Sequence, residues 1–211
     1  MSGTGAIGLM AVFAVDALNM IYIAHLGDPA LTAAIGFAGA VGAVQIAVSI
    51  GLTIGLGASV GREIGCGQFI RARRIASSFL LTSFLLTMAV GLITALLAHP
   101  ILRLLGASGT ALEQATRFLY ITSPFLPFMA LGMTTSALMR AVGDARRSMN
   151  VTVSGAMLTA LLDPIFILGL HEGLTGAAVS TVLSRLIVSG LGLRGAGLHH
   201  ILAWPKPAFL L

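Results

Sequence analysis

The hydrophobic pattern of the chain consists of long apolar runs separated by short polar stretches. A membrane-spanning helix needs about 20 predominantly apolar residues, and each run comes close to that length. The pattern therefore predicts an all-α integral membrane protein with six transmembrane helices, at residues 7–24, 32–56, 75–97, 118–138, 149–170 and 175–193. Residues 194–211 lack this pattern and are expected to form a cytoplasmic tail or an aberrant end.

The composition supports the membrane class. Apolar residues make up 57% of the chain, charged residues 9%, and the mean hydropathy is +1.00. Soluble domains have about 45–50% apolar and about 25% charged residues. The net charge of +5 comes from arginines between the apolar runs, so it predicts membrane orientation and no binding of nucleic acid. The single cysteine, Cys66, predicts neither a disulfide framework nor a zinc site.

Most cations lie on one side of the predicted helices. That side carries Arg62, Arg71, Arg73, Arg74, Arg140, Arg146, Arg147, Arg194 and Lys206, whereas the other carries Arg103 and Arg117. Lys and Arg concentrate in cytoplasmic loops. Both termini are therefore predicted to be cytoplasmic, in a plasma (inner) membrane.

An acid lies beside a proline within the apolar run 149–170, at Asp163 and Pro164. A membrane-embedded carboxylate costs about 2.5–3.5 kcal/mol on insertion scales, and such acids usually face a cavity or a partner. The proline removes an N–H and frees backbone groups next to the acid. We interpret this stretch as an ion or proton site, with Thr159 one turn earlier. The alternative is a helix kink with a satisfied structural aspartate.

A second acid, Asp16, lies in the first run, with Asn19 three residues later on the same helix face. Together with Tyr22 these residues are expected to point into one cavity, unless Asp16 lies near an interface and is solvated. In the last run, Arg185 follows Thr181 by one turn. It either snorkels to an interface or pairs with an acid, and snorkelling is favoured.

Two further polar features follow from spacing. Pro124 and Pro127 predict that the fourth helix is kinked or entered through a bend. Arg140 and Asp144 are four residues apart and can pair, although an exposed pair contributes little stability.

Several stretches together resemble a known family, namely Ile23–Gly27, Gly57–Gly67, Arg71–Arg74, Leu104–Ala107, Leu138–Asp144, Leu162–Gly169 and Gly176–Ser184. Their order and spacing resemble the amino-terminal lobe of the multidrug and toxic compound extrusion (MATE) transporters, over about residues 7–193. The resemblance implies a protein with two six-helix lobes that exports cationic or amphipathic compounds in exchange for H⁺ or Na⁺. One such lobe would need a second lobe or a second copy to complete the cleft.

The resemblance also implies cation-coupling residues. Asp163 and Thr181 match an aspartate and a threonine that bind the coupling cation in one branch of the family, while Thr159 and Ser136 stand where that branch has asparagines. On the first helix, Asp16 and Asn19 have the family's order reversed. Loss of two amide ligands favours H⁺ over Na⁺, with Na⁺ at Asp163 and Thr181 as the alternative. The expected substrate cavity includes Gln45 and Tyr22.

The function predicted is therefore cation-coupled antiport by one lobe, with no cofactor beyond the coupling ion. The main alternative is a non-transporting truncated or frameshifted fragment of such a transporter. A lipid-linked saccharide flippase of the same superfamily ranks lower, since Arg185 alone qualifies as a buried cation for pyrophosphate. No enzyme is predicted, because the intramembrane polar residues contain no nucleophile–base pair and no metal-ligand cluster.

Overall fold

The computed structural model of the 211-residue chain describes residues 10, 29–166 and 173–198. In these residues the regular structure is helical, which confirms the predicted all-α class. The elements are α2 (Pro29–Gly65), α3 (Phe69–Leu96), α4 (Ala98–Leu104), α5 (Gly109–Thr122), the 3₁₀ helix η1 (Ser123–Phe125), α6 (Leu126–Ala141), α7 (Ala145–Pro164) and α8 (Gly173–Leu198).

Four helical segments of the described residues are long and apolar enough to cross a membrane: Ala30–Gly65, Phe69–Leu96, Gly109–Ala141 and Leu174–Gly195. They contain or closely match the predicted spans 32–56, 75–97, 118–138 and 175–193, and several continue past the apolar run at a polar end. A fifth predicted span, 149–170, corresponds to α7, which starts with the polar sequence Ala-Arg-Arg-Ser. The predicted first helix, 7–24, lies outside the described residues apart from Met10.

Glycines end three of the helices. Gly67, Gly106 and Gly143 have φ values of 74°, 95° and 91°, a left-handed conformation that favours glycine. After Gly143, the Asp144 N–H donates to the Met139 carbonyl oxygen at 2.9 Å, as in a Schellman motif. The Asp144 carboxylate then caps α7 by accepting from the Arg147 backbone N–H at 3.0 Å, and it pairs with Arg147 Nε at 3.3 Å. Asp144 therefore caps the first turn of α7.

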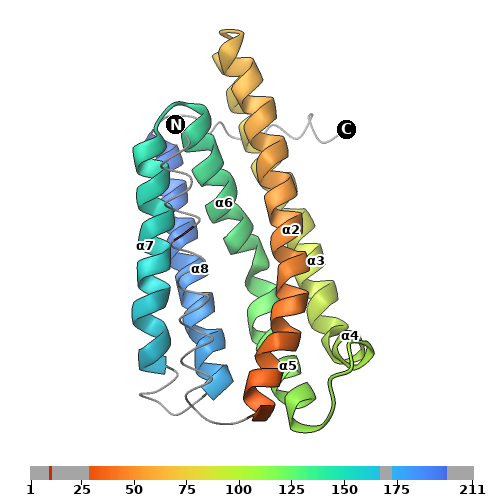
Figure 1. Ribbon diagram of the computed structural model, residues 1–211. Helices are drawn as coiled ribbons and strands as arrows, with labels where there is room; N and C mark the ends of the chain where they lie inside the picture. Colours follow the sequence, from red (N-terminus) through yellow and green to blue (C-terminus); the bar gives the residue numbers. More distant parts are fainter. Residues whose placement is uncertain (1–9, 11–28, 167–172, 199–211) are drawn as a thin grey trace.

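The helices form an elongated bundle in which α6 occupies the centre (Figure 1). Helices α2 and α3 form an antiparallel hairpin, and both pack against α6. Helix α8 packs against α5, α6 and α7. The α2–α3 turn, the α6–α7 turn and the end of α8 lie at one end of the bundle, with α4 at the opposite end. The arginines of residues 62–74, 140–147 and 194 therefore gather at a single end.

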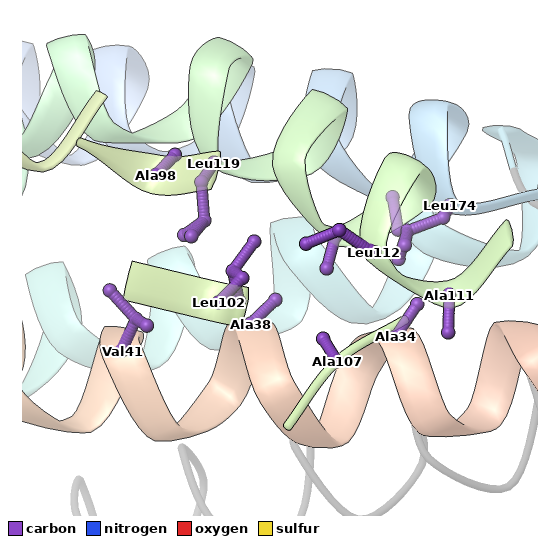
Figure 2. Close-up of a cluster of buried hydrophobic side chains, with 12 residues drawn as sticks. Ala34, Ala38, Val41, Ala98, Leu102, Ala107, Ala111, Leu112, Leu119 and Leu174 are labelled. Atoms are coloured by element: carbon purple, nitrogen blue, oxygen red, sulfur yellow. The ribbon is translucent and has the colours of Figure 1, made fainter. Parts of the chain in front are cut away.

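Two clusters of small and branched apolar residues fill the interior. The first joins α2, α4, α5 and the start of α8, and its largest members include Leu102, Leu112, Leu119 and Leu174 (Figure 2). The second joins α2, α3 and α6 through Leu56, Val60, Ala72, Ala76, Leu80 and Leu138. Many alanines in both clusters let the helix backbones approach closely, as is typical of membrane helices.

The seam between α6, α7 and α8 depends on glycine. A Cβ atom added to Gly132 of α6 would lie 2.9 Å from Val188 Cγ1, and one added to Gly155 of α7 would lie 2.5 Å from Val188 Cγ2. Gly192 of α8 similarly faces the Thr135 hydroxyl of α6. The side chain of Val188 therefore fits between two glycines on neighbouring helices.

Large apolar side chains also cover the outside of the bundle. Ile54 is 66% exposed, Leu92 48% and Leu96 74%. In water such a surface would promote aggregation, whereas in a bilayer it contacts lipid tails. The polar side chains that remain inside, such as Ser49, donate mainly to carbonyls one turn earlier on their own helix.

Candidate functional site

The long helix at residues 109–141 is interrupted near its middle, between α5 and α6. Pro127 has no N–H to donate to the Ser123 carbonyl, so the Leu126 N–H donates there instead, across three residues. This shift leaves the Thr122 carbonyl without the donor that an α-helix would give it. The proline spacing predicted a kink, and the structure confirms it as the 3₁₀ helix η1.

Three other helices contact this break. Gln45 of α2 donates from Nε2 to the Ser123 hydroxyl at 3.0 Å, and both side chains are buried. Gly91 of α3 lies so close to the Ser123 carbonyl oxygen that a Cβ atom there would overlap it. Arg185 of α8 donates from Nη1 to the Thr122 carbonyl oxygen at 2.7 Å. The break is therefore held from three sides, mostly through polar groups.

The expectation that Arg185 snorkels to an interface is wrong. Arg185 lies eleven residues after Leu174 and ten before Gly195, the ends of its span. The rise to either end is about 15 Å, which is longer than an arginine side chain. Among the described residues, the guanidinium instead donates a hydrogen bond to the Thr122 carbonyl oxygen inside the bundle. Gln45, predicted to line the substrate cavity, is 3% exposed and binds the break.

Ser136 belongs to a separate polar group at the α6–α7 end. Its hydroxyl lies 2.7 Å from the Ser148 hydroxyl and 3.4 Å from that of Thr152, and Arg140 Nη1 donates to Ser148 at 2.9 Å. Thr152 precedes Asp163 by eleven residues on α7, a rise of about 16 Å. The structure thus separates Ser136 from Asp163, although the resemblance had placed them in one site.

Thr181 of α8 lies level with the end of α7 that carries Asp163, and Thr159 lies about one turn earlier on α7. The two helices are antiparallel (Figure 1), and Val188 contacts Gly155. Two turns before Val188 is Thr181, and two turns after Gly155 is Leu162, so the backbone of Asp163 lies level with Thr181. The Thr159 and Thr181 hydroxyls donate to Gly155 and Ala177 carbonyls at 3.0 and 2.7 Å.

The helix break lies at this same level. Gly132 of α6 contacts Val188, and Gly195 contacts Met139, so α6 and α8 run parallel. Two turns before Gly132 is Phe125, at the end of η1. The break, Thr181 and the backbone of Asp163 therefore form one layer across the lobe. Asp16, Asn19 and Tyr22 lie outside the described residues, and only the backbone of Asp163 is described.

Sequence reasoning missed the partners at the break. The hydroxyl of Ser123 carries no sequence signal, and the Thr122 acceptor is a backbone carbonyl that any residue could supply. The two prolines and the lone intramembrane Arg185 were the available signals. A proline-broken membrane helix implies an unpaired carbonyl, and an intramembrane cation implies a partner.

Broken membrane helices that meet polar side chains at mid-span are typical of secondary transporters, and the described residues define a lobe of this class. The MatE family model matches residues 6–165. The chain belongs to the MATE family of transporters. The predicted family is thereby confirmed, and the candidate spans agree with the predicted membrane class.

Similar proteins agree with this assignment. The multidrug export protein MepA of Staphylococcus haemolyticus is 29% identical over 170 residues, which cover 81% of this chain and 38% of that protein. A structure described as the outward-facing conformation of a multidrug resistance MATE family transporter of the MOP superfamily has a TM-score of 0.89 at 26% identity, covering 97% of this chain and 47% of that one.

A third similar protein is a MOP superfamily transporter from Pyrococcus furiosus Vc1, whose description reports a reversed polarity of the binding pocket that suggests a different function. It has a TM-score of 0.87 at 27% identity, covering 94% of this chain and 44% of that one. The chain thus spans less than half the length of each of these three proteins.

Proposed function

We propose that this chain is the amino-terminal lobe of a multidrug exporter that expels cationic or amphipathic compounds in exchange for protons. The family membership and the multidrug exporters among similar proteins support the transport class. The observation that carries the coupling site is the layer formed by the backbone of Asp163, Thr181 and the α5–α6 break. An acid at this depth of the lobe has the location at which transporters bind coupling ions.

The proposed mechanism depends on the charge of Asp163. An ionised carboxylate within the membrane is costly, so protonation removes a large part of that cost. A cationic substrate would compete with the proton for the same carboxylate. Proton entry would then expel the substrate, and rocking of this lobe against its counterpart would change the side that is open. Thr159 lies one turn before Asp163 on α7, and Thr181 of α8 lies level with it. Both would orient the proton or the water that carries it.

Protons fit the proposed site better than sodium. Sodium needs several oxygen ligands arranged around it, and the positions that carry amides in the sodium-binding branch are threonine and serine here. Ser136 contacts Ser148 and Thr152, which lie about 16 Å or more along α7 from Asp163, so it is too distant to share an ion with that carboxylate. A proton requires only the carboxylate. Asp16 would be a second proton acceptor on the first helix.

A complete cleft requires a second lobe, or a second copy of this chain acting as a parallel dimer. The share of MepA that the chain covers, 38%, supports this part of the proposal. A non-transporting fragment is the alternative. We also propose that the arginine-rich end of the bundle faces the cytoplasm, since Lys and Arg concentrate there in membrane proteins. Both termini would then be cytoplasmic.

The decisive test is binding of a cationic dye to the purified chain in nanodiscs, with proton release followed by a pH indicator. We expect ethidium binding to weaken as pH falls, and Asp163→Asn to abolish both proton release and the pH dependence. Asp144→Asn is the matched control, because that carboxylate caps α7 at the end of the bundle. Unchanged proton release by Asp163→Asn would remove Asp163 from the coupling site. Dye export from proton-loaded liposomes then shows whether the chain transports alone.

A further inference from the structure

The carbonyl end of α5 lies in the middle of a membrane span. Thr122 is the last residue of α5 and stands thirteen residues after the start of the span Gly109–Ala141. The C-terminus of a helix carries a partial negative charge of about half an elementary charge. The break leaves the Thr122 carbonyl oxygen, in this last turn, without the backbone N–H that a continuous α-helix would supply, because the Leu126 N–H bonds to Ser123 instead. The lobe therefore holds, at a buried position where water is scarce, a carbonyl oxygen that lacks its backbone donor.

We propose that Arg185 is a tethered cation that neutralises this helix end and positions the break between α5 and α6. Its Nη1 atom donates to the Thr122 carbonyl oxygen at 2.7 Å, a short distance typical of charge-assisted hydrogen bonds. In broken transporter helices, such carbonyl ends bind a free cation. Here the protein supplies the cation from α8.

The described carboxylates lie too far away to be partners of Arg185. Glu63 and Asp144 stand at the arginine-rich end of the bundle, and Glu113 precedes Thr122 by nine residues, a rise of about 14 Å. Among the described side chains, the guanidinium is therefore stabilised by the helix end and not by a carboxylate.

The other contacts at the break also restrain its position. Gln45 donates to the Ser123 hydroxyl from α2, and Gly91 of α3 packs against the Ser123 carbonyl. Two prolines alone would leave a flexible joint, because the hydrogen bonds they remove would otherwise stiffen it. With Arg185 the joint is tied to α8, one turn from Thr181. The guanidinium thus sets the relative position of α5, α6 and α8.

Chemical rescue tests this proposal directly. The full chain in nanodiscs is compared with Arg185→Ala by thermal unfolding and by hydrogen exchange of the peptide covering residues 119–129. We expect Arg185→Ala to lower Tm by about 4–8 °C and to speed exchange at the break at least tenfold. Millimolar methylguanidinium should restore at least half of each loss, because it refills the vacated cation position. Sodium should restore less, since it lacks the planar donors of a guanidinium.

Arg194→Ala is the matched control, because Arg194 is an exposed arginine on the same helix near its end. Methylguanidinium should change neither this variant nor the wild type. If Arg185→Ala does not fold, Arg185→Lys and the length-matched Arg185→Met replace it, with faster exchange at residues 119–129 expected for Met than for Lys. Wild-type exchange in Arg185→Met, or no rescue of Arg185→Ala, would overturn the proposal. None of these assays measures transport, so their outcome is independent of the proton-coupling proposal.

Discussion

The α5–α6 break and the α6–α7–α8 seam hold the same bundle together in opposite ways. At the break, Arg185 and Gln45 reach across from other helices to bind polar groups of the kinked segment. At the seam, Gly132 and Gly155 remove side chains so that Val188 fits between two backbones. One region relies on hydrogen bonds and charge, the other on shape.

This difference follows from the solvent. Lipid tails are as apolar as leucine, so burying apolar surface does little to drive membrane helices together. Close packing and interhelical hydrogen bonds remain as sources of association. The seam uses packing where the helices are continuous. The break uses hydrogen bonds because its prolines have already released backbone groups that need partners. The chemistry of each contact thus follows from the local state of the backbone.

A substitution at Gly91 should lower stability the most, because this close glycine contact lies directly at the α5–α6 break. Gly91→Ala would place a Cβ atom on the Ser123 carbonyl oxygen, and a backbone oxygen cannot turn away without moving the break. We expect a loss of about 3 kcal/mol in unfolding free energy, measured by denaturant titration in mixed micelles. Gly51→Ala is the control, because a Cβ atom there meets nothing within 4 Å. Equal stability of the two variants would show that the contact with Ser123 is unimportant.

The seam should respond less strongly, because a side chain can yield where a backbone cannot. Gly155→Ala would press on Val188, and we expect a loss of about 2 kcal/mol. Adding Val188→Ala removes the clashing methyl groups, so the double variant should be more stable than the sum of the two single changes predicts. Gly190→Ala, which meets no atom within 4 Å, is the matched control. Strict additivity in this cycle would contradict the packing described.

The apolar runs predicted four of the spans well. A helix in lipid satisfies its own backbone hydrogen bonds, so the length and hydropathy of a run are sufficient to predict a spanning helix. The predicted spans were shorter than the helices, as at 32–56 compared with α2 (Pro29–Gly65), since a helix can continue beyond the membrane. The chain reversals depended on Gly67, Gly106 and Gly143, whose positive φ values a bare sequence does not display.

The candidate site was predicted unevenly for a physical reason. Pro124 and Pro127 act on their own backbone, so their kink could be predicted from sequence. The partners of Arg185 and Ser136 come from other helices, so they depend on the register between helices, which the sequence does not contain. A resemblance placed Ser136 beside Asp163, yet Ser136 contacts Ser148 and Thr152, which lie about 16 Å or more along α7 from Asp163. The roles of Asp163, Thr159 and Thr181 in ion coupling stay predictions.

The smallest of these effects should come from Gln45, because its bond to Ser123 joins two neutral groups. A neutral buried hydrogen bond contributes about 1 kcal/mol net. Gln45→Met keeps the length of the side chain but leaves the Ser123 hydroxyl without its donor, so we expect a loss of about 1 kcal/mol by the same titration. Ser123→Ala should then cost little more in the Gln45→Met background, because the hydroxyl no longer has this bond to lose. A full, additive loss in the double variant would mean that the two residues stabilise the break independently. Near-complete coupling would confirm that α2 holds the break through this single bond, as α8 does through Arg185.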